Sequence, residues 1–344
     1  MVDSLFILRS DINNFRMNFI YKIREKEITV FLIKMLIFLA LVIMLDFSIG
    51  SILKYFYFKQ KSGLLYRTTY SMDSTRADFL VLGSSTATHH YNSDLLEKRL
   101  GISVYNAGRN ANPIFYDFAV FQSILKRYTP KIVLLDFNVE EFKVNPDDYD
   151  KISSLLPYYK DHPEIRSIIR LKSPYENYKL LSKIYPFNSL LFTIGIGSTN
   201  FNTNRDDIND VKGYVPLYRV WTKRITTDTS IKEYELDSNK INTLKSFVYQ
   251  CTTFNIQLYI IVSPRFVKYS GSDISIEIAR KIAKQSNFSL YDYSKDTIFW
   301  EHKEYFADGI HLNNDGATIF SNKVVDTILK SKQYLHIKSK KPFQ

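Results

Sequence analysis

The chain has 344 residues, of which 45% are apolar, enough for one large α/β domain with an additional segment or for two domains. Its formal net charge of +11 favours anionic partners such as lipid headgroups or acidic polysaccharides, but no block of Lys and Arg stands out, so nucleic-acid binding is not expected. The single cysteine, Cys251, excludes an intrachain disulfide and a cysteine-based metal site.

A long apolar run near the N-terminus, residues 30–53, predicts a transmembrane helix. Its only charged residues are Lys34 and Asp46, and a spanning helix needs about 20 apolar residues. The Leu, Ile, Val and Phe residues of the run contribute very roughly −7 kcal/mol to insertion, against about +2 to +3 kcal/mol for Asp46. A cleaved signal peptide and a buried core helix are the alternatives. The length of the run and the lack of a small-residue cleavage site favour a retained anchor.

The charges beside this run bear on its orientation. Lys22, Arg24 and Lys26 lie in the N-terminal tail, residues 1–29, and favour a cytoplasmic N-terminus, although four basic residues between 54 and 67 flank the other end. A short tail, one anchor and a large body together predict a single-pass protein of the inner (cytoplasmic) membrane. Its large domain is then expected outside the cytoplasm.

From about residue 75 short apolar runs alternate with amphipathic stretches. The apolar runs predict strands at 79–82, 104–108, 131–137, 257–262 and 289–293. The amphipathic stretches predict helices near 93–100, 115–126, 238–252, 274–285 and 314–329. Because continuous apolar runs suit strands covered on both faces, the alternation predicts an α/β domain, residues 75–335, with a mainly parallel sheet.

Residues 143–230 interrupt this alternation and are rich in Tyr, Asn, Asp and Pro. Helix-like patterns occur near 164–171 and 175–184. We interpret the segment as a helical and loop insertion that caps the sheet. A disordered linker is the alternative, but so many aromatic residues argue against it.

The first predicted strand of the domain ends abruptly at Gly83, which is followed by Ser84 and Ser85. A serine at such a turn can project its oxygen above the sheet edge while backbone N–H groups point the same way. A nucleophilic serine requires this arrangement, because the turn then presents the oxygen and stabilises the oxyanion. Plain turn chemistry is the alternative interpretation of these small residues.

A second polar stretch, Asp308-Gly309-Ile310-His311, supplies an acid and an imidazole three residues apart. A carboxylate at this spacing can bind one ring nitrogen and leave the other free to take a proton from a serine. A structural histidine is the alternative. A metal site is not expected, because His302 and Asp315 lie nearby without any H-E-x-x-H or H-x-x-x-H spacing.

With these two stretches the sequence resembles the SGNH (GDSL-like) hydrolase family, over about residues 77–140 and 240–330. Gly83-Ser84-Ser85 is similar to the G-D-S block, with Ser84 in place of the usual aspartate, and Asp308–His311 is similar to the D-x-x-H block. The family's two middle blocks contribute a glycine N–H and an asparagine side chain.

The resemblance assigns these middle positions to Gly108 and Asn138, which follow the next two strands along the chain. The sequence around Asn138 lacks the family's G-x-N-D form, so Asn106 and Asn110 are alternatives for the asparagine. Arg109 and Arg265, each close after a predicted strand end, are candidates for contact with an anionic glycan.

The resemblance implies a fold, a site and a function. The implied fold is a three-layer α/β/α sandwich of flavodoxin-like type, with Ser85, Asp308 and His311 as the catalytic residues. The oxyanion hole would combine Ser85, Gly108 and Asn138, and no cofactor is implied. The implied function is that of a membrane-anchored serine esterase (deacetylase) or O-acyltransferase that acts on acyl esters of a cell-envelope polysaccharide. The alternative is an inactive SGNH-like protein that binds glycan or assists assembly with a membrane acyltransferase.

Overall fold

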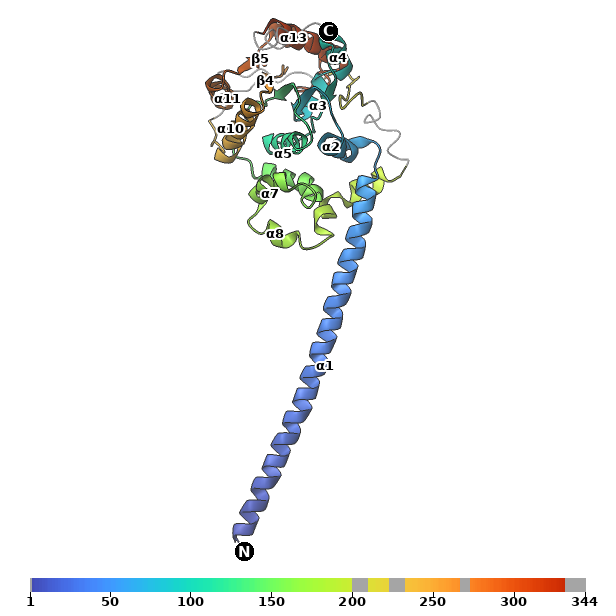
Figure 1. Ribbon diagram of the computed structural model, residues 1–344, viewed down its shortest axis with the longest axis vertical. Helices are drawn as coiled ribbons and strands as arrows, with labels where there is room; N and C mark the ends of the chain where they lie inside the picture. Colours follow the sequence, from blue (N-terminus) through green and yellow to red (C-terminus); the bar gives the residue numbers. More distant parts are fainter. Residues whose placement is uncertain (1, 200–209, 223–232, 267–272, 332–344) are drawn as a thin grey trace.

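The computed structural model describes residues 2–199, 210–222, 233–266 and 273–331 (Figure 1). One long N-terminal helix, α1 (Val2–Phe58), leads into an α/β body that begins with α2 (Gly63–Asp73). The last residues of the predicted domain, 332–335, and residues 200–209 and 223–230 of the predicted insertion lie outside the described residues.

The body is organised on a five-stranded parallel sheet with the strand order β2-β1-β3-β4-β5. The strands are β1 (Phe79–Gly83), β2 (Val104–Asn106), β3 (Ile132–Asp136), β4 (Gln257–Val262) and β5 (Ser289–Asp292). The chain leaves β1 towards β2 and leaves β3 towards β4, so the strand order reverses between β1 and β3. In doubly wound sheets of this order, ligands bind at the carboxyl ends of the strands beside such a switch point.

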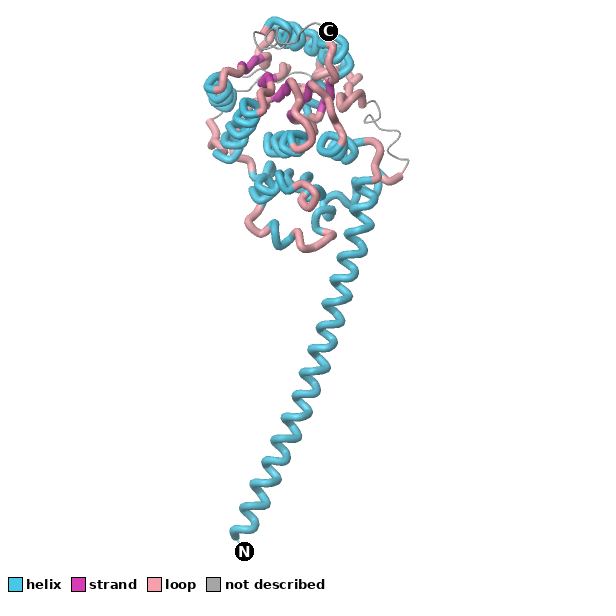
Figure 2. The backbone as a smooth tube through the Cα atoms, in the orientation of Figure 1, coloured by secondary structure: helices cyan, strands magenta, loops and turns pink. Residues whose placement is uncertain are grey.

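Helices cover both faces of the sheet, which is compatible with a three-layer sandwich (Figure 2). Leu80 and Leu82 of β1 pack in one core with α2, α5 (Ile114–Leu125), α10 (Ser238–Thr253) and α11 (Ile274–Gln285). Phe79 and Val81 point to the other face, as alternation along a strand requires, and pack with α3 (Ser85–His90), α4 (Ser93–Leu100) and α13 (Asn314–Lys330). The predicted parallel α/β body is therefore confirmed.

Short helices make up the described part of the insertion. In chain order they are α6 (Pro146–Lys151), η1 (Ile152–Tyr158), η2 (Pro163–Ile165), α7 (Arg166–Lys172), α8 (Glu176–Lys179), η3 (Tyr185–Leu190) and α9 (Leu191–Gly197). Two further short helices, α12 (Thr297–Trp300) and η6 (Lys303–Tyr305), lie between β5 and α13. The insertion packs beneath α5 and beside the end of α1 (Figure 1).

The first helix is much longer than the predicted anchor. In the described part of the chain, Arg24–Phe58 is the one helix long and apolar enough to cross a membrane. Its 35 residues measure about 52 Å, whereas a bilayer core needs about 30 Å. The C-terminal part packs on the body instead: Tyr57 is fully buried and its hydroxyl donates to that of Tyr158 at 3.1 Å.

Asp46 of α1 has hydrogen-bond partners in a turn of the insertion. Its carboxylate accepts hydrogen bonds from Ser182 Oγ at 2.5 Å, Lys183 N at 2.7 Å and Ile184 N at 3.2 Å. The helix predicted near 175–184 is confirmed only in its first half. Only α8 forms there: the N–H groups of Leu181 and Ser182 make tight turns, and those of Lys183 and Ile184 donate to Asp46.

Candidate active site

The turn after β1 places Ser85 at the carboxyl edge of the sheet. Gly83 has φ +141°, and a Cβ there would lie 2.8 Å from the Asp136 carbonyl oxygen and 2.9 Å from Ala87 Cβ. Only glycine fits such a close approach of β1, β3 and the following helix. The chain turns sharply as a result, and α3 begins at Ser85 with its side chain partly exposed.

Ser85, His311 and Asp308 form a continuous hydrogen-bonded row. Ser85 Oγ lies 2.7 Å from His311 Nε2, and His311 Nδ1 lies 2.9 Å and 3.0 Å from the two Asp308 carboxylate oxygens. Because the carboxylate can only accept, Nδ1 carries the proton and Nε2 is left to accept from the serine hydroxyl. Two segments more than two hundred positions apart thus meet as the sequence predicts.

Asp308 is held in its ionised form. Partial burial alone would raise its pKa, but the hydrogen bonds from His311 Nδ1 and from the backbone N–H groups of Ile310 and His311 outweigh that effect and hold the pKa well below its ordinary value. Arg219 adds an exposed ion pair at 3.0 Å to the same carboxylate. The acid is therefore charged at neutral pH and orients the imidazole.

His90 and His89 support the site from α3. Fully buried His90 accepts a hydrogen bond at Nε2 from the backbone N–H of Leu312, 2.9 Å away, and so fixes the residue that follows His311. His89 places its ring 5.5 Å from that of His311 and its Nδ1 2.7 Å from the Val215 carbonyl. Burial lowers the pKa of His89 to about 4 and lowers that of His90 well below its ordinary value, so both rings are neutral.

Two of the three predicted oxyanion donors are already hydrogen-bonded. The Gly108 N–H donates to Asn106 Oδ1 at 3.0 Å, and Asn138 Nδ2 donates to Glu141 Oε2 at 2.9 Å. Asn138 still lies beside the turn, because its Oδ1 accepts from Ser84 Oγ at 3.2 Å. As the first residue of α3, Ser85 has an N–H that needs no intrahelical acceptor.

The alternative asparagines take different positions. Asn106 is 1% exposed, and its Nδ2 donates to the carbonyl oxygens of Ala87 at 2.7 Å and Tyr91 at 3.3 Å, so it ties β2 to α3. Asn110 is exposed, and its Nδ2 lies 3.3 Å from His89 Nε2. Asn106 is thus a structural residue, whereas Asn110 borders the site.

Three buried carboxyl groups lie close to the turn between Gly83 and Ser85, a feature that the sequence analysis missed. Asp117 accepts the Gly83 N–H at 3.0 Å, Glu141 accepts from Asn138 and from the Ile114 N–H, and Asp136 accepts from Tyr91 and Ser263 hydroxyls. Burial raises the pKa of each of them, to about 6 for Asp136. Asp117 thus fixes the Gly83 backbone and Glu141 fixes the Asn138 amide, whereas Asp136 holds two hydroxyl groups.

A cleft of about 640 Å³ runs over the carboxyl end of β3; its lining includes the chain neighbours of Ser85 and His311 but none of the three residues of the Ser-His-Asp row. Ser84, Asn138 and Ile310 line it, and Arg265 contributes a cation to its wall. Arg109, the other arginine considered from sequence, is buried and donates to Thr68 Oγ1. Among the described residues, no group of His, Cys, Asp and Glu side chains could hold a metal ion.

The fold and this row define a class of structure: a parallel α/β body with a Ser-His-Asp contact at the carboxyl edge of its sheet. No protein-family model and no curated protein sequence matches the chain.

Proposed function

We propose that this chain is a membrane-anchored serine esterase or O-acyltransferase of the SGNH (GDSL-like) type, acting on acyl esters of a cell-envelope polysaccharide. The observation that carries the proposal is the 2.7 Å contact between Ser85 Oγ and His311 Nε2, with Asp308 bound to the other ring nitrogen. A cleft lined by Ser84 and Ile310, the chain neighbours of Ser85 and His311, supports it, because it offers space for a substrate at the same edge of the sheet. The body would lie outside the cytoplasm, held by α1 in the inner membrane.

The reaction follows from the row. His311 Nε2 takes the proton of Ser85 as its oxygen attacks the ester carbonyl, and Asp308 stabilises the imidazolium that forms. The Ser85 N–H binds the oxyanion, and each further donor that joins it is worth about 3 kcal/mol in the barrier. His311 then gives the proton to the leaving alcohol. Water or a sugar hydroxyl takes up the acyl group from Ser85, which completes hydrolysis or transfer.

A fluorophosphonate probe tests the nucleophile. The full chain in detergent is expected to label at Ser85, and Ser85→Ala is expected to abolish labelling. Ser123→Ala is the matched control, because it removes a serine hydroxyl on α5 that donates to the Ala119 carbonyl and contacts no residue of the row. An unlabelled wild type, or labelling that survives Ser85→Ala, contradicts the proposal. Mass spectrometry of envelope glycan from a deletion strain then separates the activities, since lost acyl groups indicate a transferase and gained ones an esterase.

One observation favours a second candidate, an inactive SGNH-like protein that binds glycan or partners a membrane acyltransferase in assembly. The Gly108 N–H and one N–H of the Asn138 amide donate to neighbouring side chains, Asn106 and Glu141. If these bonds persist with substrate bound, the oxyanion lacks the Gly108 donor and one Asn138 donor that the resemblance implies. The same probe distinguishes the two candidates, because an inactive protein does not label.

A further inference from the structure

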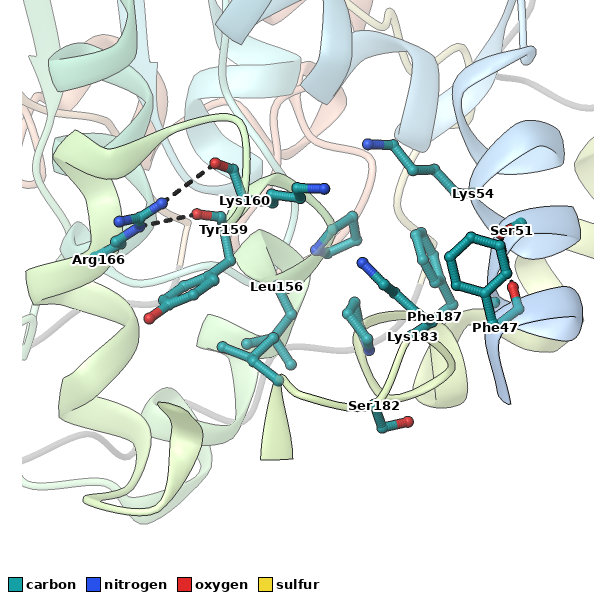
Figure 3. A pocket seen from close by; sticks show the side chains of 14 residues that line it. Phe47, Ser51, Lys54, Leu156, Tyr159, Lys160, Arg166, Ser182, Lys183 and Phe187 are labelled. Atoms are coloured by element: carbon teal, nitrogen blue, oxygen red, sulfur yellow. Dashed lines mark hydrogen bonds between the residues drawn. The ribbon is translucent and has the colours of Figure 1, made fainter. Parts of the chain in front are cut away.

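A second pocket, distant from Ser85 in the sequence, opens between α1 and the insertion (Figure 3). It has a volume of about 370 Å³, in the range of small-ligand sites. Its walls come from residues 47–54 of α1 and from residues 156–187 of the insertion. None of these residues takes part in the Ser-His-Asp row.

The contacts of α1 place this pocket next to the apolar stretch of the helix. Asp46 binds the 182–184 turn, and at Gly50 the helix approaches so closely that a Cβ would lie 2.4 Å from the Lys183 carbonyl carbon. On the N-terminal side of Asp46, residues 28–45 are exposed along their whole length. If α1 spans the membrane as proposed, residues 28–45 lie in the hydrocarbon core of the bilayer, and the pocket, which begins at Phe47, lies at its boundary.

The neighbouring surface of the insertion is unusually apolar for a face in water. Tyr178, Leu181 and Phe192 are 72%, 78% and 80% exposed, and Tyr175 and Leu191 are exposed beside them in the sequence. Contacts of α1 with η3 and α9 keep this part of the insertion next to the helix. Large aromatic and aliphatic side chains at this level are typical of a surface that rests in the membrane interface.

The pocket itself combines cations with an apolar wall. The side chains of Lys54, Lys160 and Lys183 extend into the same space (Figure 3). Lys54 pairs with Asp161 at 2.9 Å, whereas Lys160 and Lys183 make no ion pair with any residue of the described ranges. Arg166 donates to the carbonyl oxygens of Tyr159 and Lys160 and so fixes the segment that carries Lys160.

Apolar side chains from both α1 and the insertion form the other wall of the same pocket. Phe47 from α1 lines the pocket together with Leu156, Pro186 and Phe187. A ligand that fits both sides has an anionic group and an attached apolar chain. Basic pockets beside a membrane-spanning helix bind anionic lipid headgroups by this combination.

We propose that this pocket binds the phosphate headgroup of an anionic membrane phospholipid. The phosphate lies among Lys54, Lys160 and Lys183, and the acyl chains pass Phe47 into the bilayer. This inference rests on the membrane anchorage in the proposed function, but it does not depend on the chemistry at Ser85.

Native mass spectrometry of the full chain in detergent, titrated with phosphatidylglycerol, tests the site. We expect one phosphatidylglycerol to bind in preference to phosphatidylcholine, and Lys160→Gln with Lys183→Gln to weaken this binding roughly thirtyfold. The matched control, Lys245→Gln with Lys281→Gln, removes the same charge from exposed positions on α10 and α11. It is expected to bind phosphatidylglycerol like the wild type. Equal melting midpoints of the two double variants show that both remain folded.

Three outcomes overturn the inference in different ways. If the Lys160 and Lys183 variant binds phosphatidylglycerol like the wild type, the lipid site is wrong. If inorganic phosphate or glycerol phosphate displaces the lipid at equal concentration, the pocket is a site for free phosphate. If alkaline carbonate extracts the chain from membranes, the anchorage fails and the lipid site with it, whereas fluorophosphonate labelling of Ser85 reports separately on the esterase.

Discussion

Replacing Asp308 by Asn tests the role of the row most directly, because the change is almost isosteric. In the structure Asp308 Oδ1 accepts the backbone N–H groups of Ile310 and His311 at 3.0 Å and 2.9 Å. An amide oxygen can keep both of these bonds. Its NH₂ group then takes the place of Oδ2. In the wild-type structure Oδ2 accepts from His311 Nδ1 at 2.9 Å. The loop is therefore expected to keep its shape.

In the Asp308→Asn variant, in contrast, the ring proton of His311 is expected to move from Nδ1 to Nε2. Oδ1 stays 3.0 Å from Nδ1, but both of its lone pairs already accept backbone N–H groups. The NH₂ group at the position of Oδ2 therefore makes Nδ1 an acceptor, the ring proton moves to Nε2, and Nε2 can no longer accept from Ser85. We expect the rate of acylation to fall by roughly 10³ to 10⁴, equivalent to about 4 to 5.5 kcal/mol in the barrier. The second-order rate constant of fluorophosphonate labelling measures this loss.

A matched control removes the other partner of the carboxylate. Arg219 is 67% exposed, and an exposed ion pair is worth at most about 1 kcal/mol, so Arg219→Gln is expected to change labelling less than about fivefold. Melting midpoints near that of the wild type would show that both variants are folded. If the Asp308 variant labels within tenfold of the wild type, the carboxylate does not set the tautomer and the mechanism is wrong.

Three further predictions concern the residues around the row, each measured by urea unfolding of the chain in detergent. Gly83→Ala should lower the free energy of unfolding by about 2 to 4 kcal/mol, because a Cβ has no room there, whereas Gly101→Ala, at φ +69° in open space, should cost only about 1 kcal/mol. His90→Phe should cost about 1 to 3 kcal/mol, because it leaves the Leu312 N–H buried and unpaired, and should also slow labelling of Ser85. Asp136 keeps its proton up to about pH 6 in the folded state but loses it near 3.8 when unfolded, so its contribution to stability, present below pH 3.8, should decline by about 3 kcal/mol as pH rises to 6. Asp136→Asn should remove that part of the pH dependence, and an unchanged pH profile would contradict the assignment.

Much of the fold is readable from local pattern. The apolar run that ends at Gly83 and the apolar face of the closing helix, with Phe320 and Val324, are set by residues close together in the chain. The same holds for the Asp308–His311 spacing, which one loop can satisfy alone. These features need only short-range physics, and the structure has them within a residue or two of the predicted bounds.

Features that depend on distant partners were not predictable in this way. From the sequence alone, Asp46 is a charge that opposes membrane insertion of an apolar run. Its three hydrogen-bond donors lie about 136 positions away and cannot be identified from the local pattern. The bonds from Gly108 to Asn106 and from Asn138 to Glu141 join residues only two and three positions apart. The Asn106 side chain, however, is also held by the carbonyl oxygens of Ala87 and Tyr91, 19 and 15 positions away, which the local pattern does not reveal. A sequence motif identifies which residues gather at such an edge, but not which of their donors remain free.

The join between α1 and the body has a consequence for where the protein can work. Only four residues, 59–62, separate α1 from α2, and Tyr57 and Asp46 fasten the helix to the insertion. The body is thus joined to α1 by a short connection and by side-chain contacts, and not by a long linker. If α1 spans a bilayer and Ser85 is active as proposed, Ser85 lies at a fixed height above the lipid, and a polymer can react only where it passes at that height.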